Sequence, residues 1–123
     1  MEQSSFCPRF LHAVELVGRR WTGSILRALL AGPVRYHEIR SAIPDLSDRM
    51  LSERLRELEA EGIVTRSVIP ETPVRVEYAL TEKGRALEGP ISAIAAWAEA
   101  WLPAPDQPAA KTAPSMVEED AQR

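Results

Sequence analysis

The sequence predicts a mainly α-helical fold that carries a small pair of β-strands. The strongest helical signal lies in residues 47–62, where Leu51, Leu55 and Leu58 recur at the spacing of one helix face. The period changes directly afterwards, because residues 63–69 are rich in β-branched side chains and residues 74–80 alternate apolar with polar ones. A turn and a shorter helix precede the leucine helix. This order of elements describes a winged helix-turn-helix, in which the strand pair is the wing.

The earlier elements follow from periodicity and from residues that stop helices. We expect helices over 8–17, 22–31 and 37–42 and a short edge strand over 34–36. Gly18 and the Gly32-Pro33 pair end the first two helices, and Thr22 is expected to cap the second. After the wing, Thr81 caps a last helix, which is expected to break near Gly89-Pro90.

The last helix has an unusually wide apolar stripe beyond that break. Trp97 and Trp101 are separated by one helical turn in an alanine-rich segment. A helix that only packs on its own small domain needs a narrower stripe than this one. The pattern therefore indicates a surface for another protein chain.

Composition bounds the class of protein. The chain has 123 residues, a formal net charge of −3 and 45% hydrophobic residues. We expect one folded domain over 7–102, a flexible N-terminus over 1–6 and a disordered acidic tail over 103–123. No apolar run approaches the roughly 20 residues of a membrane span, so no membrane association is expected. A single cysteine fits the reducing cytoplasm, where we expect the protein to act.

An enzyme is not expected. The sequence contains only two histidines, His12 and His37, and no HExxH, P-loop, dinucleotide or nucleophile-elbow motif. Potential metal ligands are too sparse for a zinc site. We therefore expect no catalytic residue, no cofactor and no metal.

The outward face of the leucine helix fits DNA recognition. Arg49 lies near the end of the helix that usually enters the major groove, and it is our first choice for a base contact. A bidentate arginine–guanine pair discriminates by about 1–3 kcal/mol. Ser47 suits a phosphate at the positive end of the helix dipole, and Ser52 can reach either a base or a phosphate. Arg56 is the second outward arginine; the alternative for both arginines is a surface ion-pair lattice with Glu53 and its neighbours.

Two further arginines of this region have different expected roles. Arg54 lies beside the leucine stripe and is expected to bridge to another helix rather than to contact DNA. Arg66 belongs to the wing, where arginines commonly enter the minor groove. Arg75 is a second wing candidate, but its neighbour Glu77 makes a local ion pair an equal alternative.

Charge is unevenly distributed along the chain. Residues 19–85 contain twelve Lys and Arg residues and ten Asp and Glu residues, so this central part is slightly basic, whereas the C-terminal segment is acidic. This balance predicts moderate non-specific DNA binding and a dependence on two linked half-sites.

Several motifs together carry a family resemblance. They are Cys7-Pro8, Trp21 ahead of an Ile-Leu-Arg helix, and the stretches LSDRMLSERLRELEAEGIVTR and PETPVRVEYALTEKGRAL. In this order and spacing the chain resembles the HxlR-type winged helix-turn-helix transcriptional regulators. The resemblance implies a homodimeric bacterial repressor or activator whose first and last helices are dimerisation helices. It also places Arg35 and Arg40 beside the DNA backbone and makes the following residues the expected dimer interface: Leu11, Ile91, Ile94, Trp97, Ala98 and Trp101.

Cys7 is the candidate chemical sensor. It precedes a helix, where the dipole and nearby Arg9 favour its thiolate, and members of the resembled family often sense oxidants or electrophiles with a cysteine here. The equal alternative is a small apolar side chain buried at the dimer interface. Because the chain has one cysteine, any disulfide must be intermolecular.

The expected function is sequence-specific binding of double-stranded DNA by a homodimer. A symmetric dimer presents two recognition helices about 34–36 Å apart to a palindromic operator. Residues 47–61 would read the major groove, and the wing over 63–80 would contact the flanking minor groove or backbone. A small-molecule or oxidant effector fits this function. The alternative is a winged-helix module for protein–protein assembly, which salt-dependent binding to duplex DNA would distinguish.

Overall fold

The computed structural model describes residues 7–105. Its elements follow in the order α1 (Pro8–Val17), α2 (Thr22–Leu29), β1 (Val34–Arg35), α3 (Tyr36–Ala42), α4 (Asp48–Ala60), β2 (Val64–Ile69), β3 (Arg75–Leu80), α5 (Glu82–Arg85) and α6 (Glu88–Trp101). They form two compact units, Met1–Glu88 and Gly89–Arg123. No helix within the described residues is both long enough and apolar enough to span a membrane.

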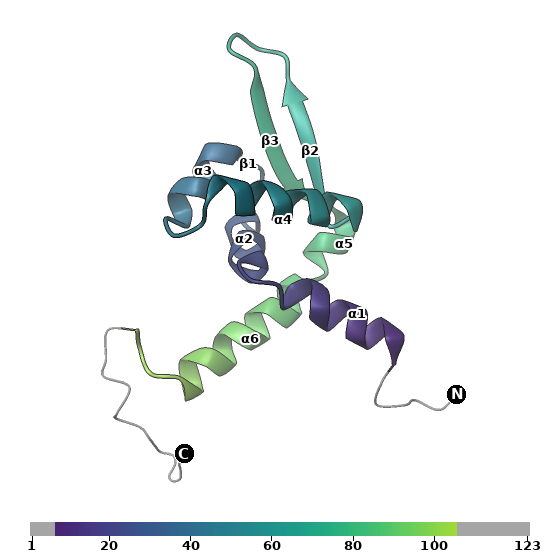
Figure 1. Cartoon of the computed structure of the whole chain (residues 1–123), viewed down its shortest axis with the longest axis vertical. Coiled ribbons are helices and arrows are strands. Elements are labelled where there is room, and N and C mark those ends of the chain that lie inside the picture. The colour runs from purple at the N-terminus through teal and green to yellow at the C-terminus, as the bar shows by residue number, and fades with distance from the viewer. Residues whose placement is uncertain (1–6, 106–123) are drawn as a thin grey trace. The chain divides into compact units, whose positions relative to one another are not determined.

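The first unit is the predicted winged helix-turn-helix. Figure 1 shows α4 lying beside α3 and α2, with the β2–β3 hairpin projecting from the end of α4. The sheet is antiparallel with the order β1-β3-β2, so the short strand β1 lies at an edge as predicted. Val34 is paired with Tyr78, and Val64 is paired with Leu80. Strand β3 is therefore the central strand of the sheet, paired with β1 on one side and with β2 on the other.

The leucine stripe of α4 lies at the centre of the core. Leu51, Leu55 and Leu58 are each at most 1% exposed. Four aliphatic side chains of α2, α3 and the turn after α3 are buried as well: Ile25, Leu29, Ile39 and Ile43. Each fully buried aliphatic side chain of this size contributes about 1.5–3 kcal/mol through removal from water. The predicted burial of the leucine face of this helix is therefore confirmed.

The hairpin follows the predicted alternation only where it lies against the core. Tyr78 and Leu80 are buried, whereas Val74 is 63% exposed and precedes the first residue of β3. On β2, Val64 is buried and Val68 is exposed. The distal half of the wing lacks a packing partner in the described chain, so its apolar side chains meet solvent.

Several boundaries differ from the sequence prediction: α2 ends at Leu29 rather than at residue 31, β1 ends at Arg35, and α3 begins at Tyr36 rather than at residue 37. Trp21, not Thr22, is the residue before α2; it has a left-handed φ of 78°, and Thr22 is buried as the first helical residue. The break in the last helix falls before Glu88, and Pro90 lies in the first turn of α6. That turn tolerates proline because its N–H groups have no intrahelical acceptor.

The turn from β3 into α5 fastens the wing to the end of α4. Thr81 Oγ1 accepts a hydrogen bond from Gly84 N at 3.0 Å and donates to Gly62 O at 2.6 Å. Gly62 itself has a φ of 77° and ends α4, as predicted. At Gly84 an added Cβ would lie 2.2 Å from the carbonyl oxygen of Ile63, so only glycine fits there.

The predicted domain limits fall mostly on residues that the structure does not describe. The expected flexible N-terminus, 1–6, lies wholly outside the described residues, and the expected acidic tail lies outside them from residue 106 onward. Residues 103–105 follow the end of α6 without regular structure. The domain organisation given above stays a prediction.

Candidate nucleic-acid interface

Helix α4 is capped at both ends by local interactions. Ser47 Oγ accepts a hydrogen bond from Met50 N at 3.1 Å, which satisfies one of the free donors of the first turn. At the other end Gly62 N donates to Glu59 O and Ile63 N donates to Leu58 O. These caps and the buried leucines fix the orientation of the helix, so its remaining side chains project from a rigid mount.

Two arginines project from the outer face of α4. Arg49 has an 88% exposed side chain, and its Nε lies 3.5 Å from Glu53 Oε2. Arg56 is also exposed. An exposed i,i+4 pair of this kind contributes only about 0.3–0.5 kcal/mol, so it does not hold the Arg49 guanidinium against a stronger partner. The geometry leaves both arginines able to meet an anionic ligand.

The two serines of the helix differ in their surroundings. Ser47 is exposed, and its hydroxyl proton remains available because the cap uses only an acceptor lone pair. Ser52 is half-buried, and its Oγ lies 3.1 Å from the hydroxyl oxygen of Tyr36. Tyr36 also donates towards Asp48 O at 3.1 Å. Ser52 thus takes part in the contact between α3 and α4.

Arg35 and Arg40 occupy opposite ends of α3. Arg35 is exposed, and its backbone N–H donates to Glu38 Oε1 at 2.7 Å, which starts the helix. Arg40 Nε donates to Asp48 Oδ1 at 2.7 Å, and its Nη1 donates to Leu46 O. Arg40 therefore fastens the turn between α3 and α4, while the Arg35 side chain remains at the surface.

The two wing arginines also differ. Arg66 is exposed on β2, opposite Tyr78. Arg75 on β3 lies between two carboxylates, with Nη2 at 3.1 Å from Glu71 Oε2 and Nε at 3.2 Å from Glu77 Oε2. Of the two alternatives given for Arg75, this geometry favours the local ion pair.

The inner side of α4 carries a hydrogen-bonded and ionic network, of which the sequence predicted only the role of Arg54. Arg54 is 8% exposed, and its Nε donates to Arg20 O at 3.0 Å, so it bridges as expected, but to the connection between α1 and α2 rather than to another helix. Its Nη1 lies 3.1 Å from Glu57 Oε2, and Glu57 Oε1 lies 3.0 Å from Arg19 Nε. The connection between α1 and α2 is thereby tied to the recognition helix.

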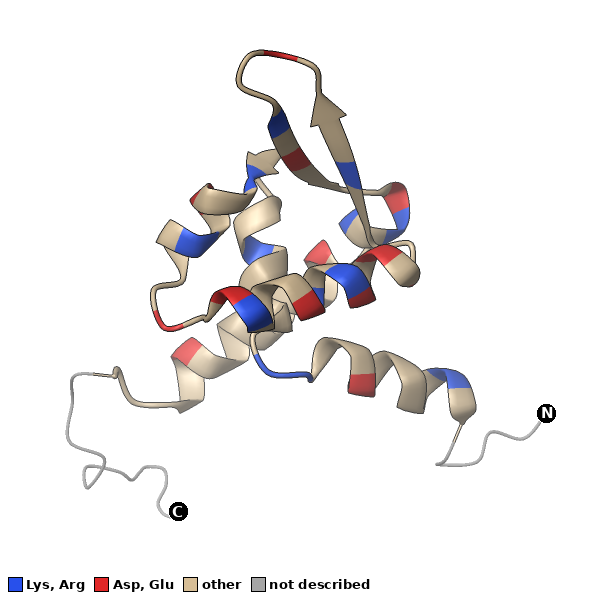
Figure 2. Ribbon diagram, turned by 45° about the horizontal axis from the view of Figure 1, so that its top comes forward, with Lys and Arg blue, Asp and Glu red and all other residues tan. Residues whose placement is uncertain are grey.

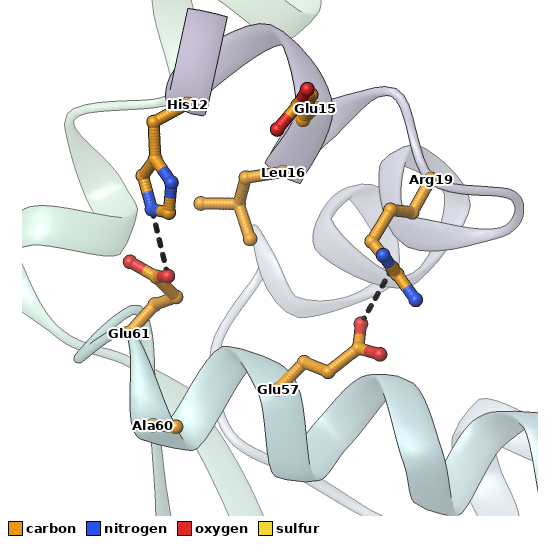
Figure 3. A pocket seen from close by; sticks show the side chains of 7 residues that line it. All are labelled: His12, Glu15, Leu16, Arg19, Glu57, Ala60 and Glu61. Atoms are coloured by element: carbon orange, nitrogen blue, oxygen red, sulfur yellow. Dashed lines mark hydrogen bonds and ion pairs between the residues drawn. The ribbon is translucent and has the colours of Figure 1, made fainter. Parts of the chain in front are cut away.

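A hydrogen bond joins α1 itself to the end of α4. His12 Nε2 lies 2.8 Å from Glu61 Oε2, and Figure 3 shows both this pair and the Arg19–Glu57 pair spanning a cleft under α1. Sequence spacing gives no sign of such contacts because the partners lie 49 and 38 residues apart along the chain.

Charges of both signs alternate along the outside of the first unit. Figure 2 shows acidic and basic segments in turn along α4, with basic segments also on α3 and on the hairpin. Glu57, Glu59 and Glu61 make the C-terminal end of α4 acidic. A phosphate backbone would be repelled there, so the N-terminal half is the end suited to DNA.

The candidate sensor and interface residues lie on α1 and α6. Cys7 is half-buried and is the N-cap residue of α1, which places its thiol at the positive end of that helix as expected. Helix α1 has no buried residue, and Leu11 is 41% exposed beside exposed Phe10 and Val14. The side chains of α6 differ: Ile94, Trp97 and Trp101 are more than half exposed, Ala98 is half-buried and Ile91 is buried.

No group of three or more histidine, cysteine, aspartate or glutamate side chains within residues 7–105 is arranged to hold a metal ion.

Comparison with known proteins places these features in a family. The family model for the HxlR-like helix-turn-helix matches residues 16–106. The chain is 54% identical over 102 residues to the uncharacterized HTH-type transcriptional regulator YvaP of Bacillus subtilis, covering 83% of this chain and 94% of YvaP. It is 49% identical over 96 residues to the HTH-type transcriptional regulator YodB of the same organism, covering 78% of this chain and 86% of YodB.

Solved structures agree with this assignment. The reduced form of YodB from B. subtilis matches with a TM-score of 0.72 and 48% identity, covering 79% of this chain and 95% of that chain. The redox regulator HypR in its oxidized form matches with a TM-score of 0.72 and 39% identity, covering 76% of this chain and 96% of that chain. With α4 mounted on a leucine core, followed by a wing and matched over most of its length, the chain belongs to the HxlR-like helix-turn-helix family of DNA-binding transcriptional regulators.

Proposed function

We propose that the protein is a homodimeric transcriptional regulator that binds a palindromic operator in double-stranded DNA. The recognition segment 47–61 enters the major groove, and the wing over 63–80 contacts the flanking minor groove or backbone. The observation that carries the proposal is the mounting of α4: its leucine face is buried while Arg49, near its N-terminal end, is 88% exposed. Helices in this arrangement read bases with their N-terminal residues.

The candidate residues divide into contacts and supports. Arg49 reads a base, Ser47 donates its hydroxyl proton to a phosphate, and Arg35, Arg56 and Arg66 meet phosphates from exposed positions. The others contribute by holding the contacting elements in place: Ser52 and Arg40 through the α3–α4 junction and Arg75 through the wing. This division follows from which donors are already used inside the protein.

The proposed dimer uses the exposed apolar faces of α1 and α6. Leu11 with its neighbours Phe10 and Val14 forms one face, and Ile94, Trp97, Ala98 and Trp101 form the other. Apolar patches of this kind, rich in tryptophan, are typical of protein–protein contacts. Ile91 is 7% exposed, so the contact with a partner falls to the residues that follow it.

We further propose that an oxidant or electrophile changes operator affinity through Cys7. Support comes from the thiol position at the N-terminus of α1 and from two relatives: YodB has been solved in reduced, diamide-treated and quinone-bound forms, and HypR is described as a redox regulator. A regulator of this kind acts on bacterial DNA, so we place it in the cytoplasm, as a non-enzyme without membrane association.

The experiment compares Arg49→Ala with Glu53→Ala on the DNA upstream of the protein's own gene. If Arg49 reads a base, Arg49→Ala abolishes operator binding at unchanged dimer mass, whereas Glu53→Ala preserves it because the guanidinium is only released from a weak pair. Fluorescence anisotropy at several salt concentrations measures both.

Other results would point elsewhere. Equal losses in both variants would mean that Arg49 serves the ion-pair lattice, and unaltered binding by Arg49→Ala would remove its assignment. If the unmodified protein binds no duplex even at low salt, the assembly-module alternative is the better account of the exposed arginines.

A further inference from the structure

A small, mostly apolar cavity lies under α1, apart from the DNA-facing side chains. It has a volume of about 200 Å³ and is lined from several elements by Ala13, Leu16, Val17, Ile63 and Leu87, with Arg9, His12, Glu61 and Lys83 completing its wall. It adjoins the cleft of Figure 3, with which it shares His12, Leu16 and Glu61. The cavity belongs entirely to the first unit.

The volume of the cavity limits what can occupy it. An apolar cavity of about 150 Å³ lined by aliphatic and aromatic side chains holds one benzene ring. This site is open to solvent on one side, and its volume of about 200 Å³ accepts one six-membered ring with one small substituent. The apolar lining favours a ring without polar atoms of its own.

The charged side chains in the wall determine whether a positive or a negative group of the ligand is favoured. Lys83 Nζ donates to Glu61 O at 2.6 Å, which uses one of its three N–H donors and leaves two. Arg9 adds a second cation from α1. The one carboxylate in the wall, that of Glu61, is already paired with His12 Nε2 at 2.8 Å. An anionic group therefore finds donors in the wall, while a cationic group would compete with His12 and meet Lys83 and Arg9.

We propose that this cavity binds a monocyclic aromatic carboxylate, with the ring against Leu16 and Ile63 and the carboxylate on Lys83 and Arg9. Such a ligand touches α1, the turn after α4 and α5 at the same time. The position is separate from Cys7 chemistry, since no covalent bond is formed and none of the lining residues is a cysteine.

The test uses the full chain with benzoate as the probe and methyl NMR as the measurement. At constant ionic strength, we expect saturable shifts of the Leu16, Val17, Ile63 and Leu87 methyl groups and none at Val68 in the wing. Benzylamine, which has the same ring and a positive charge, is expected to leave all of them unchanged. Because no DNA is present, the result does not depend on the proposed operator binding.

Two variants and a matched control locate the site. Ala13→Phe fills the cavity without removing a core side chain, since Ala13 is exposed on one side, and is expected to abolish the shifts. Lys83→Gln keeps a donor for Glu61 O but loses the charge and is expected to weaken binding about tenfold. Arg85→Gln removes a charge from the same short helix outside the cavity and is expected to bind benzoate normally.

Several results of this experiment would contradict the proposed ligand site. Shifts that do not saturate, that centre on Ile94 of α6, or that survive Ala13→Phe would overturn the assignment of the cavity. Equal binding of benzoate and benzylamine would overturn the assignment of an anion. A cavity already filled by a partner protomer would give no shifts at all, which would also overturn the proposal.

Discussion

Gly84 shows how one missing side chain holds the end of the recognition helix to the wing. The backbone of α5 approaches Ile63 so closely that a Cβ at position 84 would lie 2.2 Å from its carbonyl oxygen. The same carbonyl accepts from Thr81 N at 2.9 Å, so it cannot move away without breaking that bond. The strand, the turn and the helix end are therefore locked at a single contact.

We expect Gly84→Ala to lower the free energy of unfolding by about 1–3 kcal/mol, because overpacking forces the backbone apart. Gly23→Ala is the matched control, since Gly23 lies in α2 with nothing within 4 Å of an added Cβ. It should raise the free energy of unfolding by about 0.5–1 kcal/mol through a lower entropy of the unfolded chain. Urea unfolding measures both; equal midpoints for the two variants would contradict the close contact.

Cys7 permits an equally direct test of the proposed redox response. Treatment with diamide is expected to change the operator affinity of the unmodified protein and to leave Cys7→Ser unaffected, because Cys7 is the only thiol in the chain. Anisotropy before and after treatment gives the affinity, and a non-reducing gel shows whether two chains have been joined. A Cys7→Ser protein that responds like the unmodified one would assign the cysteine to packing instead.

At the scale of elements, the wing carries two arginines with different expected roles, one in DNA binding and one in stability. Arg66→Ala is expected to reduce the slope of log affinity against log salt by about 0.9, the value for one lost phosphate contact. Arg75→Ala should leave the slope unchanged and lower stability, because Arg75 is held between Glu71 and Glu77. Titrations at several salt concentrations, with urea unfolding alongside, separate the two roles. A reduced slope for Arg75→Ala would return it to the DNA contacts.

The helices and strands could be predicted from the sequence where the residues that define them are close neighbours along the chain. The leucine spacing of α4, its serine cap and its glycine stop all act within one helical turn of the chain, and each prediction is confirmed. The supporting contacts were not predictable, because Tyr36 meets Ser52 and His12 meets Glu61 only after the helices are packed. Arg54 is intermediate: its angle on the helix indicated a bridge, but not that Arg20 O would accept it.

At the scale of the whole molecule, the exposed apolar face of α6 argues for assembly. Trp97 and Trp101 are 56% and 64% exposed and lie on the same side of the helix, one turn apart. Leaving two indole rings in water forgoes the free energy that burial of such large side chains provides. Two linked copies would also compensate for the small excess of positive charge over residues 19–85 of each copy.

We therefore expect Trp101→Glu to shift the protein from dimer to monomer and to weaken binding to the full palindrome far more than binding to one half-site. A charge in the centre of an apolar interface costs several kcal/mol unless it is paired. Glu99→Lys is the control, because residue 99 lies two positions from each tryptophan and so points to the other side of the helix. Light scattering after size exclusion gives the mass; a monomeric unmodified protein would contradict the proposed dimer.

The short connection at residues 61–63 has a consequence for the operator itself. Gly62 turns the chain directly from the end of α4 into β2, and Thr81 and Lys83 hydrogen-bond the carbonyl groups of that turn. These hydrogen bonds hold the end of α4 and the base of the hairpin together at one turn. On B-DNA each base pair advances the axis by about 3.4 Å and turns it by roughly 35°. In the proposed complex, the number of base pairs between the bases read by α4 and the flank touched by the wing is then set by the protein, while the identity of those intervening pairs is left free.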